Sequence, residues 1–160
     1  MGGHFFLGWL PQKNRLIRLN GQILSLCEIL KFVSSSAAEA ELGASFLNTK
    51  QARIFRLALE ELGHTQPPTP INCDNETAVG ICNGTVKRQR LRSMEMRYFW
   101  VGDQVKNGVV AVQYAPGVEN MGDYMSRRFL TPHQVRVRPL YVHMPNSLRE
   151  LPRSMPLRNL

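Results

Sequence analysis

The sequence predicts an α/β fold with a partly parallel sheet. The strongest observation is a proline-free stretch at 36–62, whose apolar residues recur at helical spacing. A short apolar run at 69–73 follows a proline-rich connector and indicates a strand, and residues 75–83 then indicate a short helix. Residues 109–114 (VVAVQY) form the clearest strand by residue type, because valine and tyrosine favour the pleated state. Strands and helices in this order are typical of a mixed α/β domain.

The long helix carries signals at both of its ends. Ser36 can serve as N-cap, and Glu39 stands three residues later, as in a capping box. Gly63 is a natural residue to follow the last turn. The apolar residues at helical spacing are Ala40, Ala44, Leu47, Ile54, Ala58 and Leu62.

The residues before this helix indicate a hairpin. An apolar run at 4–9 (HFFLGW) suits a buried strand, an Asn-Gly pair marks a turn, and a second apolar run follows at 22–33. The second run begins with the alternation of a half-buried strand, although its later part, 27–32, could instead be helical.

The C-terminal half carries a further helical pattern and then changes in composition. Met94, Tyr98 and Val101 begin a pattern that ends near Gly108, and its aromatic residues are expected in the core rather than on a stacking surface. A short helix is expected over 118–126. These elements place one domain over 1–130. Residues 131–160 are basic and rich in proline, so we expect a mostly disordered tail there.

The charge of the chain indicates a polyanionic partner. The formal net charge is +8, which suits nucleic acid or an anionic membrane surface. No stretch approaches the roughly 18 uninterrupted apolar residues of a spanning helix. The N-terminal apolar run is a poor signal peptide. We therefore expect an intracellular protein of the cytoplasm or nucleus, with no membrane partner.

One segment concentrates this positive charge. Residues 85–93 (TVKRQRLRS) could form a solvated face or a phosphate-binding patch, and the charge of the whole chain favours the patch. The candidate nucleic-acid-binding residues are Lys87, Arg88, Arg90 and Arg92.

The cysteines do not indicate a disulfide framework or a zinc site. Cys27, Cys73 and Cys82 are odd in number and have no close paired spacing, so we interpret them as reduced, small hydrophobic residues. The histidines are scattered along the chain, and zinc is not expected.

Three acidic residues are candidates for a metal site. Glu41 lies near the start of the long helix, Asp74 ends the strand at 69–73, and Asp123 lies in GVENMGDYMSRR. Ligands of open α/β sheets bind at the carboxyl ends of strands, where Asp74 stands. Hard cations such as Mg²⁺ take oxygen ligands, so convergence of these carboxylates would suit a nuclease that holds metal against phosphate.

Five blocks in a fixed order resemble a known family. They are SSSAAEAELGA, LEELG, PTPINCDNETAVGI, KRQRLRSMEMRYFWVGDQV and VVAVQYAPGVENMGDYMSRR. Their order and spacing resemble the ribonuclease H region at the C-terminal end of a copia-type retrotransposon polyprotein, over about residues 2–130. The resemblance implies a mixed sheet flanked by helices, and two Mg²⁺ or Mn²⁺ ions that serve hydrolysis of the RNA strand of an RNA–DNA hybrid. It implies no small-molecule cofactor.

The resemblance also assigns the carboxylates. The helix glutamate of the family matches Glu41 rather than Glu39, and the two aspartates match Asp74 and Asp123. Glu39 is then a helix-start charge that the macrodipole favours.

The chain departs from the family at its N-terminus. The first carboxylate of the family lies on the central strand of the sheet, before the block that matches GGHFFL, whereas this sequence starts with Met1 and has no acidic residue before Glu28. We therefore expect the first strand and one metal ligand to be absent and hybrid cleavage to be impaired. The alternative is a catalytically dead relic that binds nucleic acid without specificity. A third hypothesis is a globular domain whose carboxylates only cap helices.

Overall fold

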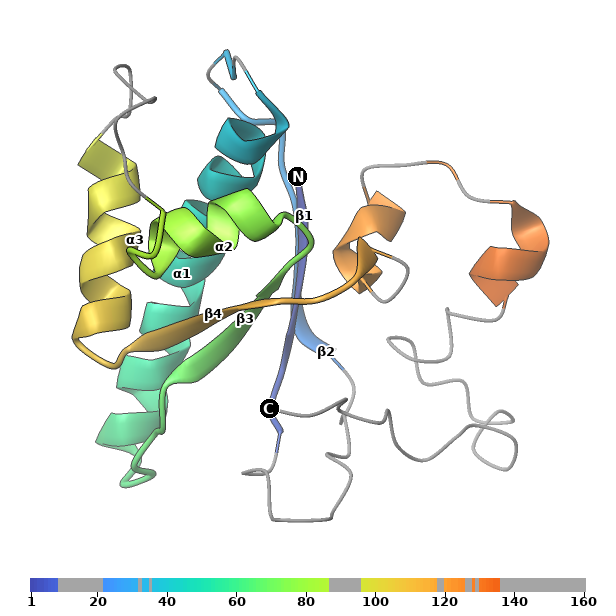
Figure 1. Cartoon of the computed structure of the whole chain (residues 1–160). Helices are drawn as coiled ribbons and strands as arrows, with labels where there is room; N and C mark the ends of the chain where they lie inside the picture. The colour runs from blue at the N-terminus through green and yellow to red at the C-terminus, as the bar shows by residue number, and fades with distance from the viewer. Residues whose placement is uncertain are drawn as a thin grey trace. The chain divides into compact units, whose positions relative to one another are not determined.

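The structure, a computed structural model, describes residues 1–8, 22–31, 33–34, 36–86, 96–117, 120–125, 128 and 130–135. It divides into two compact units, and each is described by itself. The first unit contains Met1 and residues 28–120, and the second contains residues 2–27 and 121–160. Figure 1 shows the helices and strands of both units along the chain. The predicted α/β class is confirmed.

The sheet of the first unit is a parallel pair of strands. β3 (Thr69–Cys73) lies beside β4 (Val110–Tyr114), and the register runs from Thr69 opposite Val110 to Cys73 opposite Tyr114. The strand expected at 69–73 is confirmed, and the strand expected at 109–114 begins one residue later. Both strands therefore end at the same edge of the sheet, which is the edge that Asp74 follows.

The long helix has the ends that its sequence predicts. α1 (Ala37–Glu61) is capped by Ser36, whose side-chain oxygen accepts a hydrogen bond of 3.2 Å from the backbone N–H of Glu39. Its C-cap is Leu62, and Gly63 then takes a φ of 85°. That left-handed conformation carries no Cβ penalty in glycine, so it ends the helix at the expected place.

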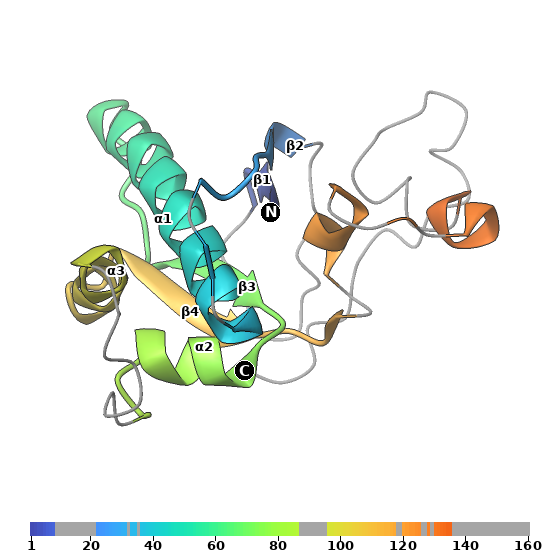
Figure 2. The ribbon, with the colours of Figure 1, turned by 90° about the horizontal axis from the view of Figure 1, so that it is seen from above.

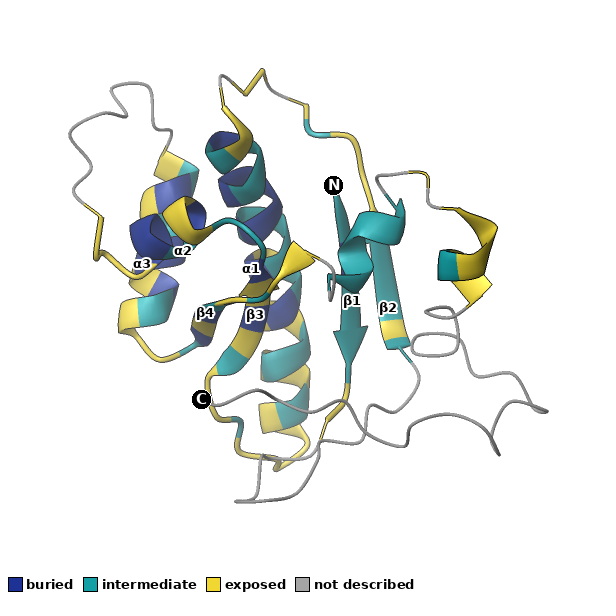
Figure 3. Cartoon of the chain, turned by 45° about the vertical axis from the view of Figure 1, so that its right-hand side comes forward, coloured by how far each residue is buried: buried dark blue, intermediate teal, exposed yellow. Residues whose placement is uncertain are grey.

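The apolar face predicted for α1 is only partly a core face. The buried residues of the helix lie between Glu39 and Ala52 and include Leu42 and Thr49 (Figure 3). By contrast, Ile54 is 52% exposed and Leu62 is 73% exposed. The apolar residues at helical spacing are therefore covered by other elements only in part. Helical spacing places apolar residues on one side of a helix, but it does not say whether another element covers that side.

Two shorter helices complete the first unit. α2 (Glu76–Cys82) is capped by Asn75, and α3 (Met96–Lys106) is followed by Gly108 with a φ of 67°. Figure 2 shows α1, α2 and α3 around β3 and β4 from above. The short helix expected at 75–83 and the helix expected to end near Gly108 are both confirmed.

The core of the first unit lies between these three helices and one face of the sheet. Alternate strand residues supply that face, while Pro70, Asn72 and Ala111 are exposed. Tyr98 is buried, as expected for an aromatic residue of the core. The buried apolar cluster consists of Leu42, Ile71, Cys73, Ala78, Ile81, Cys82, Tyr98, Val101, Val110 and Val112.

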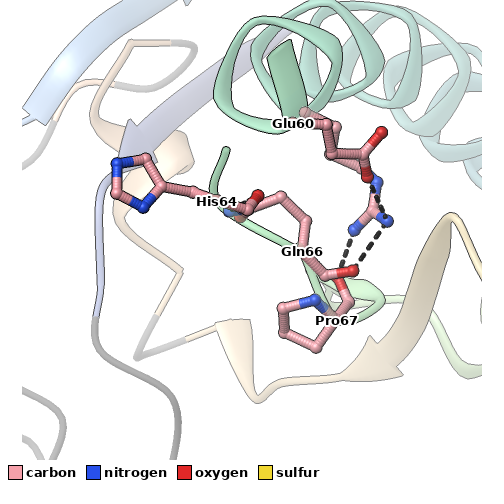
Figure 4. Close-up of polar contacts among 5 residues, drawn as sticks. Glu60, His64, Gln66 and Pro67 are labelled. Atoms are coloured by element: carbon pink, nitrogen blue, oxygen red, sulfur yellow. Dashed lines mark hydrogen bonds and ion pairs between the residues drawn. The ribbon is translucent and has the colours of Figure 1, made fainter. Parts of the chain in front are cut away.

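Arg56 joins α1 to the proline-rich connector that leads into β3. Its guanidinium donates to the backbone oxygen of Gln66 at 2.9 Å and to that of Pro67, and it forms an ion pair of 3.1 Å with Glu60. Figure 4 shows Glu60, Gln66 and Pro67 gathered at this contact. The planar fork of arginine suits two neighbouring carbonyls, so this side chain fixes the path of the chain just before β3.

The second unit contains the expected hairpin strands. β1 (Gly2–Phe6) pairs antiparallel with β2 (Gln22–Cys27), with a register shift between Phe5 and Phe6. The first strand thus lies earlier than the run at 4–9, and the second ends well before residue 33. Residues 28–31 form neither strand nor helix, so the helical alternative is wrong for them.

A short 3-10 helix packs on this hairpin. η3 (Met121–Met125) stands where a short helix was expected over 118–126. A Cβ on Gly2 would overlap the backbone oxygen of Gly122, so glycine is needed for this close approach. Residues 131–135 are helical, although a mostly disordered tail was expected from residue 131. No helix in the described ranges is long and apolar enough to cross a membrane.

Candidate metal centre

Two glutamates near the start of α1 lie on different sides of the helix. Glu39 and Glu41 are two residues apart, and a rotation of about 100° per residue places their side chains on roughly opposite faces. Glu39 is 8% exposed, and its backbone oxygen accepts a hydrogen bond of 3.5 Å from the Tyr98 hydroxyl. Burial raises the pKa of Tyr98, and the negative charge of Glu39 adds to this effect. Glu39 therefore belongs to the contact between α1 and α3.

The end of β3 brings two further polar side chains to the first turn of α1. Cys73 is 4% exposed and lies on the same face of β3 as Ile71, toward the core. Asp74 follows directly and is half-buried. Asn75 then caps α2 by accepting a hydrogen bond of 3.0 Å from the backbone N–H of Ala78. The chain is thus held on both sides of Asp74, by the sheet before it and by a helix cap after it.

Glu41, Cys73 and Asp74 meet at this edge of the sheet. Each offers one ligand atom, and these atoms lie within 4.8 Å of one another. The Cys73 thiol is 4.0 Å from Oε2 of Glu41 and 3.8 Å from the backbone oxygen of Asn75. The two carboxylates are half-buried and the thiol is buried, so the oxygen atoms form the accessible side of the cluster.

Electrostatics separate the roles of the thiol and the carboxylates. Burial raises the pKa of the Cys73 thiol, and the charges of Glu41 and Asp74 raise it further, against a lowering by the Asn75 backbone. Cys73 is therefore a neutral thiol at neutral pH. A thiolate, not a thiol, is the form that binds metal, so the two carboxylates are the ligands that the site offers.

The donor set fits a hard divalent cation. Mg²⁺ is commonly held in proteins by one or two carboxylates, with water and substrate phosphate completing its shell. Glu41 and Asp74 supply two such groups from two different elements. Their separation is also compatible with ligands shared by a pair of ions about 4 Å apart. The fit rests on oxygen chemistry and does not use the thiol.

The other predicted site residues belong to other segments of the sequence. Asp123 lies in η3, in the second unit, and its convergence with Glu41 and Asp74 stays a prediction. The four basic residues of the run at 87–92 lie outside the described residues.

The sequence interpretation missed Cys73 as a member of this cluster, because it treated all cysteines as small hydrophobic residues. Alternation along TPINC places Cys73 on the buried face of its strand, directly before Asp74. That signal was sufficient to place the thiol beside the carboxylates once Glu41 was placed at the same edge.

Proteins of plant transposons are similar to this chain. The retrovirus-related Pol polyprotein from transposon TNT 1-94 of Nicotiana tabacum is 25% identical over 107 residues, which cover 67% of this chain and 8% of that protein. The retrovirus-related Pol polyprotein from transposon RE1 of Arabidopsis thaliana is 26% identical over 129 residues, covering 74% of this chain and 9% of the relative.

The chain is homologous to a segment of these Pol polyproteins. It spans less than a tenth of the length of either relative. The similarity supports a retrotransposon Pol origin, which is the broader part of the resemblance predicted from the sequence blocks. No protein-family model matches the chain, and no solved structure matches it either.

Proposed function

We propose that residues 1–130 form a ribonuclease H-type domain that hydrolyses the RNA strand of RNA–DNA hybrids with divalent metal ions. The observation that carries this proposal is the meeting of Glu41, from the first turns of α1, with Asp74, at the end of β3. The homology to retrotransposon Pol polyproteins supports it, because the sequence blocks resemble the ribonuclease H region of such a polyprotein.

Each residue of the cluster has a role in this proposal. Glu41 and Asp74 bind and orient the metal ions, and Asp123 is the third proposed ligand. Bound divalent ions would lower the pKa of a water molecule and stabilise charge on the phosphodiester. The buried Cys73 thiol contacts Glu41 from the core side and so limits the freedom of that carboxylate.

We further propose that a polypeptide of these 160 residues cleaves hybrid only weakly. The resemblance implies a fourth carboxylate on a preceding strand, and residues 1–27 contain neither aspartate nor glutamate. Mg²⁺ holds closely to octahedral geometry, so loss of one bridging oxygen weakens its binding. Among the described strands, β3 pairs with β4 and β1 pairs with β2, which leaves each pair able to accept another strand.

The test compares the 160-residue chain with two extended chains. Each extension adds an upstream strand taken from a Pol polyprotein relative, once with its aspartate and once with asparagine in that place. We expect Mg²⁺-dependent hybrid cleavage from the aspartate version, its loss on Asp74→Asn, and improved solubility without cleavage from the asparagine version. Failure of the aspartate version to cleave would contradict the ribonuclease function. Robust cleavage by residues 1–160 that Asp74→Asn abolishes would contradict the impairment.

A second candidate function is nucleic-acid binding without cleavage. The net charge of +8 favours it, because phosphate neutralisation by lysine and arginine supplies sequence-independent affinity. Replacing Lys87, Arg88, Arg90 and Arg92 by alanine should reduce the slope of log affinity against log salt by about 0.9 for each duplex phosphate that the variant no longer neutralises. An unchanged slope would show that this run is only a solvated face.

A further inference from the structure

The chain after β4 is tied to the chain after β3. The backbone N–H of Ala115 donates to the oxygen of Cys73 at 2.9 Å, which extends the parallel ladder beyond the paired strand residues. Two residues later, the oxygen of Gly117 accepts a hydrogen bond of 3.2 Å from the N–H of Asn120. These bonds hold the turn at Gly117 next to Asp74.

Gly117 lies in direct contact with the Asp74 side chain. A Cβ built on Gly117 would lie 3.3 Å from Oδ2 of Asp74, 3.8 Å from its Cβ and 4.0 Å from its Cγ. The first of these distances is tighter than an ordinary van der Waals contact. Asp74 would therefore have to yield by a few tenths of an ångström to any side chain at position 117.

The backbone does not require glycine at this position. Gly63, Gly84 and Gly108 have positive φ values, whereas Gly117 is not in that left-handed region. A side chain at 117 is thus allowed by the conformation of the chain, and the obstacle is the carboxylate itself.

We propose that Gly117 is a positioning residue for the Asp74 carboxylate in the candidate metal centre. This inference rests on the proposed function for its consequence in metal binding, although the contact itself does not depend on it. The Cα of Gly117 faces Oδ2 of Asp74, and this oxygen keeps its position because glycine has no Cβ. A methyl group at 117 displaces the carboxylate by a few tenths of an ångström, which is a large part of the roughly 0.5 Å within which a metal site must hold its ligands.

The first arm of the test is a cycle of melting temperatures in the 160-residue chain. It uses the wild type, Gly117→Ala, Asp74→Ala and the double variant. Alanine restricts the unfolded chain, so without a clash Gly117→Ala is neutral or stabilising. We expect Gly117→Ala to lower the melting temperature in the wild type and to leave it unchanged or raise it when Asp74 is alanine. An equal change in both backgrounds would overturn the proposed contact.

The second arm measures Mn²⁺ affinity from the free-ion signal in electron paramagnetic resonance. We expect Gly117→Ala to weaken binding roughly tenfold, as loss of outer-shell support commonly does. Gly84→Ala is the control, because Gly84 has a φ of 73° with open space around its Cβ. It strains the fold without touching the site, so its Mn²⁺ affinity should equal that of the wild type.

The two arms distinguish failure of the positioning role of Gly117 from failure of the proposed metal centre. Unchanged Mn²⁺ affinity in Gly117→Ala would overturn the positioning role. If the wild type binds no Mn²⁺, the proposed metal centre is wrong, and the melting-temperature cycle alone decides whether Gly117 controls the place of Asp74.

Discussion

Asn75 directly follows the candidate ligand Asp74, and its side chain accepts a hydrogen bond of 3.0 Å from the backbone N–H of Ala78. This bond is the N-cap of α2. The same short segment therefore ends a strand, carries a carboxylate and starts a helix. Its conformation is fixed by backbone partners on both sides, which is a requirement for a ligand that must keep its place.

Loss of this cap should destabilise the first unit. Asn75→Ala removes the acceptor for the Ala78 N–H, and we expect a loss of about 1 kcal/mol in the free energy of unfolding. Asn75→Ser keeps a capping oxygen and is the matched control, with most of the stability retained. Urea unfolding monitored by circular dichroism measures both. Equal stability of the alanine and serine variants would show that the cap contributes nothing.

The contrast between the two halves of α1 predicts different effects of the same substitution. Leu42 is fully buried in the core cluster, whereas Leu57 is exposed on the same helix. Leu42→Ala should lower the free energy of unfolding by about 2–5 kcal/mol, because it removes buried apolar surface and leaves a cavity. Leu57→Ala should change it by no more than about 0.5 kcal/mol. Similar losses in both variants would mean that the distal half of α1 is covered in solution.

Arg56 should be more important for stability than its charge alone suggests. Arg56→Lys keeps the charge but cannot serve two carbonyls with one planar fork, so we expect a loss of about 1 kcal/mol or more. The control is Arg53→Lys on the exposed side of α1, which should change stability little. Thermal unfolding of the two variants measures the difference. No difference would mean that the hydrogen bonds to Gln66 and Pro67 do not hold the connector.

Burial of Cys82 predicts a loss of stability at alkaline pH. Burial raises the pKa of this thiol from the ordinary value of 9.0 to about 12, and the charge of Cys73 adds to the shift. The folded state therefore keeps a proton that the unfolded chain releases. The stabilisation is complete below pH 9 and is lost as the pH rises toward about 12.

Above pH 9, Cys82→Ala should reduce the slope of the free energy of unfolding against pH by up to about 1.4 kcal/mol per pH unit. The pKa values of Cys73 and Tyr98 are also raised, so stability still depends on alkaline pH when Cys82 is replaced. The slope of the Cys82→Ala variant is therefore compared with the slope of the wild type. Cys27→Ala, at an exposed thiol, is the control. Identical slopes above pH 9 in the wild type and Cys82→Ala would contradict the burial of this thiol.

Local signals predicted much of the first unit because they act within a few residues. Ser36 and Asn75 have side chains that accept from backbone N–H groups three residues later, and Gly63 tolerates a left-handed φ. Such choices are visible in the sequence itself. The helix ends and the strand at 69–73 could therefore be placed closely.

Contacts between distant segments could not be placed in the same way. The exposure of Ile54 and Leu62 depends on which elements cover α1, and the meeting of Gly117 with Asp74 depends on the turn after β4. The pairing of Glu41 with Asp74 was expected from the resemblance and from the rule that ligands gather at strand ends. The thiol of Cys73 beside them was not expected, because its residue type alone indicates a buried hydrophobic position.

In the proposed site Glu41 and Asp74 together hold a divalent cation, and Mn²⁺ titration monitored by electron paramagnetic resonance measures that binding. The variants Glu41→Gln and Asp74→Asn keep the shape of each side chain and remove its charge. Asp103→Asn is the control, because Asp103 is an exposed acidic residue that pairs with Lys106 on α3. We predict saturable binding by the wild type and by Asp103→Asn, and its loss in both other variants. Equal Mn²⁺ binding by all four proteins would show that Glu41 and Asp74 do not form a metal site.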